Sequence, residues 1–174
     1  MVRKSLQREP LSEEALFDYA VGVLARRMRT ERELRRLMAT RAAAGDAGQR
    51  AMDTVVRRLK ELNYLSDVRF AATYTRLRKE DQKLGRRRVA QDLAVRGVPR
   101  GIAEKQLGEA YADVDELKLA REYVERKRMK QPEGEKEQAR MMGRLLRAGF
   151  SSGTIWKLLR EWGVEAEEFE TEEN

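Results

Sequence analysis

The chain has 174 residues, of which 41% are apolar and 39% charged, and its formal net charge is +7. It contains neither cysteine nor histidine, which excludes a disulfide framework, a thiolate zinc site and general-base catalysis by histidine. No stretch approaches the roughly 20 apolar residues that a membrane span needs, and the N-terminus has no apolar run of signal-peptide type. We therefore expect a cytoplasmic all-α protein without metal or cofactor, since Ala, Leu, Arg, Glu and Lys dominate its composition.

Three helices are predicted in residues 12–65, after a basic N-terminal extension over residues 1–11. Ser12 caps the first helix, and Thr30 begins the second with the Thr-x-x-Glu spacing of a capping box. A glycine-containing loop at residues 42–48 separates the second helix from the third. The third ends near Asn63, a residue that tolerates the left-handed conformation of a helix terminus.

The link to the next helix carries Tyr64 and Leu65, where a surface turn is normally polar. We interpret both as filling the space between two helix triplets. The alternative is that Tyr64 contacts a partner directly.

A second and a third round of helices follow in residues 66–112 and 113–164. Ser66 or Asp67 caps the first helix of the second round. The inward positions include Leu77 in the second round and Leu146 in the third. The segments LAVRGV (residues 93–98) and LLRAGF (145–150) match at an offset of 52 residues. The sequence therefore predicts a tandem array of three three-helix repeats, which forms an elongated curved molecule.

The last ten residues, 165–174, form an acidic tail that we expect to be disordered. They hold six glutamates and no basic residue, so residues 1–164 carry a net charge of +13. A body this basic favours contact with nucleic acid or with a protein that coats it. One hypothesis is that the tail folds over the basic body and weakens non-specific DNA binding.

Three segments carry a resemblance to a known family. They are LKELNYLSDVRFAATYTRLR (residues 59–78), GRRRVAQDLAVRGV (85–98) and LARRMRTERELRRLM (24–38). The chain resembles the RecX family, regulators of the RecA recombinase. The resemblance implies a protein that binds in the groove of the RecA–DNA filament and inhibits RecA ATPase, strand exchange and co-protease activity in homologous recombination, DNA repair and the SOS response. It implies a regulator and not an enzyme.

Basic side chains are the candidate contacts with the RecA filament or the DNA backbone. Arginine predominates among them, and a guanidinium binds carboxylates and phosphates through two parallel hydrogen bonds. The alternative interpretation is a solvated helix face. The candidates are Arg76, Arg78, Lys83, Arg86, Arg87, Arg88 and Arg96 in the second round, and Arg26, Arg27, Arg29, Arg32, Arg35 and Arg36 in the first.

The alternative function is an independent DNA-binding helical module, which the charge alone would equally allow. We expect a monomer with weak non-specific DNA binding and no membrane contact.

A further basic cluster, at Arg126, Lys127, Arg128 and Lys130, ranks below the other candidate contact residues. Trp156 and Trp162 are assigned to the core rather than to base stacking.

Overall fold

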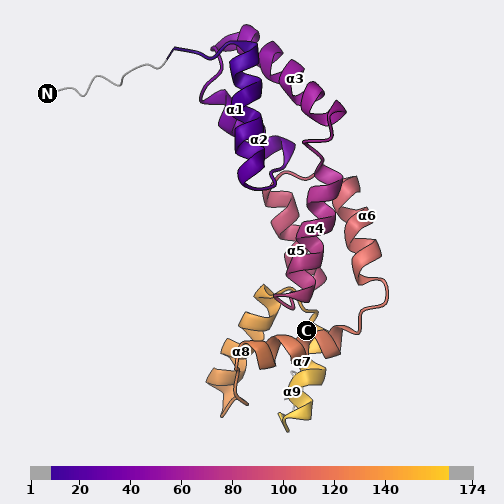
Figure 1. The fold of residues 1–174 in the computed structure, drawn as a ribbon. Coiled ribbons are helices and arrows are strands. Elements are labelled where there is room, and N and C mark those ends of the chain that lie inside the picture. Colours follow the sequence, from indigo (N-terminus) through magenta and orange to yellow (C-terminus); the bar gives the residue numbers. More distant parts are fainter. Residues whose placement is uncertain (1–8, 165–174) are drawn as a thin grey trace, which may run out of the picture. The chain divides into compact units, whose positions relative to one another are not determined.

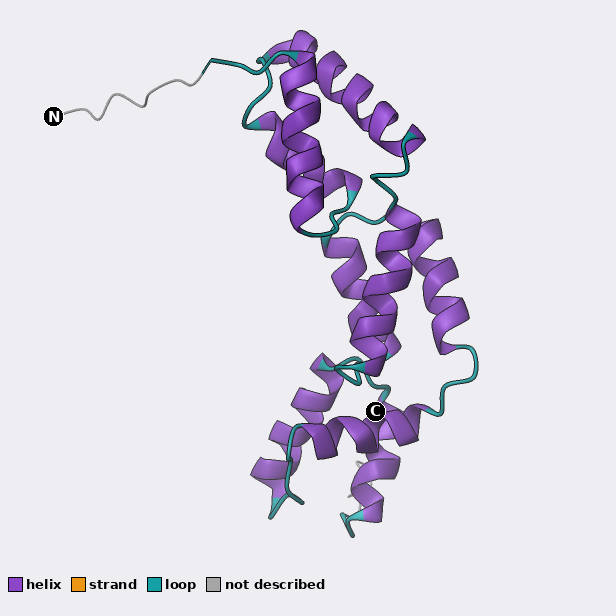
Figure 2. Cartoon of the chain, viewed as in Figure 1, coloured by secondary structure: helices purple, strands orange, loops and turns teal. Residues whose placement is uncertain are grey.

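Helices form all of the regular secondary structure in residues 9–164, the part of the chain that the computed structural model describes (Figure 1). No strand occurs among these residues (Figure 2), so the predicted all-α fold is confirmed. None of their helices is long and apolar enough to cross a membrane. The helices are α1 (Glu13–Arg26), α2 (Glu31–Ala39), α3 (Gly45–Glu61), α4 (Asp67–Glu80), α5 (Arg86–Val95), α6 (Arg100–Tyr111), α7 (Glu116–Arg126), α8 (Glu135–Arg147) and α9 (Ser152–Glu161).

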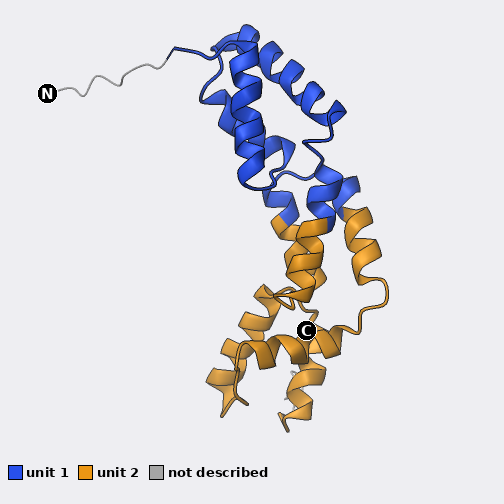
Figure 3. Cartoon of the chain, viewed as in Figure 1, with its two compact units in different colours: residues 1–72, 93–103 blue, residues 73–92, 104–174 orange. Residues whose placement is uncertain are grey.

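The chain divides into two compact units (Figure 3). Unit 1 contains residues 1–72 and 93–103, and unit 2 contains residues 73–92 and 104–174. The division passes through α4, α5 and α6, so each of these helices contributes residues to both units. The boundaries of the three predicted repeats remain a proposal.

Local signals place two helix starts and one helix end where the sequence predicts them. The Ser12 side chain accepts a hydrogen bond from the Ala15 amide at the start of α1 (3.3 Å), and Ser66 does the same for Arg69 in α4 (3.2 Å). Asn63, just after α3, adopts the left-handed conformation with φ of 58°. These three ends were predictable because each depends on residues within one helical turn.

The core of unit 1 lies between α1, α2 and α3, where α1 packs on both of the other helices. Leu65 belongs to this core and is 2% exposed, whereas Tyr64 is 56% exposed. The prediction that Tyr64 fills an internal space is therefore wrong. The buried cluster consists of Leu16, Ala20, Leu34, Met38, Met52, Val55, Val56, Leu59 and Leu65.

Helices α7, α8 and α9 enclose the core of unit 2, with α9 packed on both α7 and α8. Trp156 and Trp162 are partly buried against this core, in agreement with their predicted packing role. Leu77 and Leu146 were predicted to point inward, but they are 41% and 46% exposed. The buried cluster consists of Leu119, Ala120, Tyr123, Val124, Met141, Leu145, Ala148, Phe150, Ile155, Leu158, Leu159 and Val164.

The loop predicted at residues 42–48 is shorter than expected, because α3 already begins at Gly45. Gly48 lies in the first turn of that helix and is buried. A Cβ atom at Gly48 would come within 1.8 Å of the Ala43 carbonyl oxygen, so the chain can approach its own helix this closely only at a glycine.

Candidate functional site

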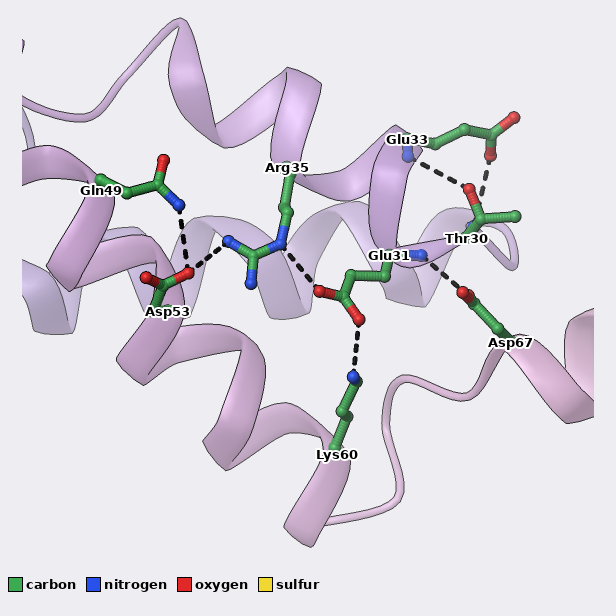
Figure 4. Close-up of polar contacts among 8 residues, drawn as sticks. All are labelled: Thr30, Glu31, Glu33, Arg35, Gln49, Asp53, Lys60 and Asp67. Carbon is green, nitrogen blue, oxygen red and sulfur yellow. Dashed lines mark hydrogen bonds and ion pairs between the residues drawn. The ribbon is translucent and has the colours of Figure 1, made fainter. Parts of the chain in front are cut away.

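Several hydrogen bonds converge on the start of α2, within unit 1 (Figure 4). The Thr30 hydroxyl is fully buried, accepts a hydrogen bond from the Glu33 amide (3.1 Å) and donates one to the Arg96 carbonyl (2.7 Å). The Glu33 carboxylate accepts from the Thr30 amide (3.4 Å) and from the Arg96 guanidinium (2.6 Å). The capping box of α2 therefore also holds the residue that follows α5.

Asp67 is a second cap of α2, contributed by the first residue of α4. Its carboxylate accepts a hydrogen bond from the Glu31 amide (2.8 Å). The sequence offered Ser66 or Asp67 as the cap of α4, but Ser66 alone takes that position and Asp67 is directed to the neighbouring helix. Burial raises the pKa of Asp67 above its ordinary value, although the Glu31 amide opposes the shift.

Arg35 is held by carboxylates from two helices, as the dashed lines in Figure 4 show. It contacts Glu31 on its own helix (2.8 Å) and Asp53 on α3 (2.7 Å). Burial raises the pKa of Glu31, but hydrogen bonds from Lys60 and Arg35 outweigh it, so this pKa lies below its ordinary value. Arg35 is therefore occupied within the fold.

A groove of about 540 Å³ lies beside this network, within unit 1. It presents Arg32 and Arg36, both of which are exposed and make no ion pair within the described part of the chain. Carboxylates and three apolar side chains share the lining, so the groove is not uniformly basic. Its walls are Glu31, Arg32, Arg35, Arg36, Ala39, Gln49, Met52, Asp67, Gly97 and Pro99.

Gly97 sets the position of Arg32. It follows α5 in the left-handed conformation, with φ of 80°, and its missing side chain makes room for the aliphatic stem of Arg32. A Cβ atom at this position would lie 2.1 Å from the Arg32 Cδ and 2.8 Å from its Cβ. The aliphatic stem of Arg32 thus packs against Gly97, and Arg32 lines the groove.

The first turn of α5 is fixed in a similar way within unit 2. The Gly85 amide donates to the Ala148 carbonyl (2.9 Å), which joins the start of α5 to the end of α8. A Cβ atom on Gly85 would lie 2.3 Å from the Gly149 carbonyl oxygen, and one on Gly149 would lie 2.4 Å from the Arg88 amide nitrogen. Two glycines thus allow backbone to pack directly on backbone.

This fixed turn carries Arg86, Arg87 and Arg88. All three are exposed, and Arg88 pairs with Asp92 one turn further on (3.0 Å). Arg86 lines a small pocket of about 170 Å³ that also includes Glu116, and the positive charge of Arg87 contributes to the lowered pKa of Glu116. Three cations at a helix N-terminus oppose the helix dipole, which costs about 0.3–1 kcal/mol each.

The structure separates the candidate cations into two classes. Six pair with carboxylates of this chain, for example Lys83 with Glu122 (2.7 Å) and Arg96 with Glu33 (2.6 Å). The other four that pair are Arg35, Arg76, Arg78 and Arg88. Exposed candidates that make no ion pair within the described ranges are Arg26, Arg27, Arg32, Arg36, Arg86 and Arg87. Arg29 is half-buried.

Sequence reasoning missed a basic surface on α8. Lys136, Arg140, Arg144 and Arg147 follow one another at helical spacing, and all four are exposed. Their spacing of four, four and three residues was visible in the sequence. The apolar positions of this helix predict its packed face, and these cations lie on its exposed face.

Family models match the second and third groups of helices. The model described as "RecX, second three-helix domain" matches residues 66–107, and "RecX, third three-helix domain" matches residues 113–159. Together the two matches cover more than half of the chain.

Curated relatives named "Regulatory protein RecX" align over most of the chain. The Trichlorobacter lovleyi protein is 31% identical over 145 residues, which cover 82% of this chain and 92% of that protein. The Halorhodospira halophila protein is 36% identical, with coverage of 82% and 84%. For the Geobacillus kaustophilus protein the values are 31% identity, 90% of this chain and 57% of the relative, so this chain spans little more than half of that relative.

The fold is shared with a solved structure. The crystal structure of RecX from Lactobacillus salivarius aligns with a TM-score of 0.69 at 20% sequence identity, and the alignment covers 87% of this chain and 96% of that chain. From the two domain matches and these relatives, the chain belongs to the RecX family of regulatory proteins, which are not enzymes.

Proposed function

We propose that this protein binds in the groove of the RecA–DNA filament and inhibits RecA ATPase, strand exchange and co-protease activity. In this proposal it acts as a cytoplasmic monomer in homologous recombination and the SOS response. Family membership supports the general role of a regulator. The observation that carries the proposal is the exposed pair Arg86 and Arg87 on the rigid first turn of α5.

The placement of this pair is unfavourable for the helix itself. Cations in a first turn lose the dipole stabilisation that an acidic residue would gain there, and α5 has no acidic residue in its first turn. Its backbone is nevertheless held by the contact of Gly85 with Gly149. Charges that cost stability and are held rigidly suit recognition of carboxylates or phosphates on a partner.

The groove beside α2 supports a protein partner more than bare nucleic acid. It combines the cations Arg32 and Arg36 with the carboxylates of Glu31 and Asp67 and with the thioether of Met52. A phosphate backbone would be repelled by the carboxylates, whereas a protein surface can supply both charges and apolar side chains. We infer that this groove accepts side chains of the RecA filament.

The decisive experiment is the single-strand-dependent ATPase of the cognate RecA, titrated with wild-type protein and with Arg86→Glu/Arg87→Glu. Arg88 is left unchanged because it pairs with Asp92. Compared with the wild type, the double variant should need a concentration about tenfold higher, or more, for the same inhibition. A tenfold increase corresponds to a loss of about 1.4 kcal/mol of binding free energy. Circular dichroism checks that its helix content is unchanged.

A matched control is Arg50→Glu/Arg57→Glu on α3, which makes the same change of charge at exposed positions with no ion pair in the described structure. This control should inhibit like the wild type. If Arg86→Glu/Arg87→Glu inhibits equally well, the start of α5 is not the contact surface.

The second candidate function, an independent DNA-binding module, is favoured by the net charge of +7. Binding to the same DNA without RecA, measured in parallel, separates the two. Inhibition at well below one molecule per RecA protomer, with little naked-DNA binding, supports the filament regulator. Inhibition only where this protein already coats the DNA supports the module.

A further inference from the structure

Helix α8 carries a row of like charges on its exposed face. Lys136, Arg140, Arg144 and Arg147 are exposed and make no ion pair within residues 9–164. Like charges at such spacing destabilise a helix by about 0.2–0.5 kcal/mol per pair. A bound anion would relieve this repulsion between the exposed cations.

The row borders a groove of about 390 Å³ within unit 2. Four cations line it, namely Arg128, Lys130, Arg140 and Arg144. The single carboxylate in the lining, Glu137, accepts a hydrogen bond from the Glu133 amide (2.9 Å) and makes no ion pair with an arginine of the described chain. The groove is therefore strongly cationic, with four exposed cations and one carboxylate in its lining.

The last described residues lie next to this groove. Gln131, one of the lining residues, donates a side-chain hydrogen bond to the Trp162 carbonyl. Two residues further on, Val164 is buried in the core of α7, α8 and α9. Whatever follows Val164 therefore starts close to the cationic lining.

Residues 165–174 lie outside the described residues, and their sequence matches the groove in charge and length. They contain six glutamates and no basic residue. Ten residues can reach at most about 33–36 Å, whereas the row from Lys136 to Arg147 rises about 16 Å along the helix. Attachment in the same chain gives an effective concentration of about millimolar for a short linker.

We propose that the groove beside α8 is the docking site of the acidic segment 165–174 of this same chain. The segment competes there with other polyanions, so the groove binds a nucleic acid or an acidic protein only after displacing it. The groove favours the segment over nucleic acid as its resident occupant, because its Gln131 contacts Trp162, which lies two residues before Val164, the residue from which the segment extends. This inference does not depend on the proposed action on RecA.

Paramagnetic relaxation in the full chain tests the contact. Because the chain has no cysteine, Asn174→Cys gives one attachment point for a nitroxide label. Amide signals of residues 128–131 and 140–147 should broaden selectively, and the broadening should fade at about 1 M salt, where the Debye length is about 3 Å. Uniform broadening, or broadening confined to another surface, overturns the proposal.

Two variants with equal charge change separate the groove from a general charge effect. Arg140→Glu/Arg144→Glu should abolish the selective broadening, whereas Arg50→Glu/Arg57→Glu on α3 should preserve it. Persistence of the broadening in the first variant, or its loss in the second, contradicts docking in the groove.

Competition is measured with a fluorescent oligo(dT) strand as the probe. A chain that ends at Val164 should bind the strand about threefold to tenfold more tightly than the full chain. This gain should disappear in Arg140→Glu/Arg144→Glu and remain in the α3 control. If the strand shifts the α8 signals with equal affinity in the presence and absence of residues 165–174, the groove is a nucleic-acid site and the proposal fails.

Discussion

Gly97 determines how the side chain of Arg32 packs beside α2. The sequence alone does not predict that these two residues lie close together. The positive φ of Gly97 was predictable, because a glycine after a predicted helix is typical of a helix end. The close approach of the Arg32 stem to Gly97 was not predictable, since the two residues belong to different helix groups. A small residue here serves both the turn and the display of a side chain.

Gly97→Ala should lower the free energy of unfolding by about 1–3 kcal/mol, because alanine is strained at positive φ and its Cβ would strike Arg32. Urea denaturation measures the change. Gly101→Ala in α6 is the control, since nothing lies within 4 Å of its added Cβ. That control should be neutral or slightly stabilising. Equal effects of the two substitutions would show that the Arg32 contact contributes nothing.

At the scale of whole helices, α7 holds Ser151, the N-cap residue of α9. The Glu116 carboxylate accepts hydrogen bonds from the Ser151 amide (3.0 Å), the Ser151 hydroxyl (2.5 Å) and the Thr154 hydroxyl. Burial raises the pKa of Glu116, but these hydrogen bonds and the nearby Arg87 outweigh it, and the pKa lies below its ordinary value of 4.5. The charged carboxylate thus stabilises the fold.

The stabilisation by Glu116 should depend on pH. Because its pKa is lower in the folded than in the unfolded protein, the contribution is fully present above pH 4.5 and is lost as the pH falls through the folded value. Glu116→Gln should lose about 1–2 kcal/mol at neutral pH and much less near about pH 3. Denaturation at both pH values measures this, with the exposed Glu125→Gln as control. A loss independent of pH would assign the effect to packing.

Helix positions were predictable from local signals, but the exposure of single residues was not always so. The capping box at Thr30 and the turn at Asn63 follow from neighbours in the chain. Leu77 and Leu146 have the spacing of inward residues, but both are exposed. The width of the buried face of a helix depends on how the neighbouring helices pack against it. Asp67 was predictable as a cap, but its recipient, α2, is a tertiary choice.

The same limit applies to the candidate site. A basic segment can be read from the sequence, but its pairing partners cannot. Arg96 finds Glu33, which lies 63 residues earlier, and Lys83 finds Glu122 in a later helix. These long-range pairs remove residues from the predicted contact surface. Arg86 and Arg87, like Arg32, are predicted contact residues that the fold holds in place and that make no ion pair among residues 9–164.

For the whole molecule, the net charge of +7 favours binding to bare DNA, and the salt dependence of such binding identifies the contacts. Each phosphate neutralised contributes about 0.9 to the slope of log affinity against log salt. Arg86→Ala/Arg87→Ala should leave the slope for duplex DNA unchanged if these side chains contact RecA. A slope reduced by about 2 would place both on phosphates and favour the independent DNA-binding module.

The hydrogen bond from Gly85 to Ala148 also sets the order in which parts of the fold can form during biosynthesis. The ribosome adds residue 148 long after residue 85, and chains fold from the N-terminus as they emerge. The capping network of α2 can form once residue 96 has emerged, whereas the turn that carries Arg86 and Arg87 gains its last backbone support only when residues 148 to 150 are outside the ribosome. A nascent or prematurely terminated chain thus lacks the rigid arginine display that the finished protein has.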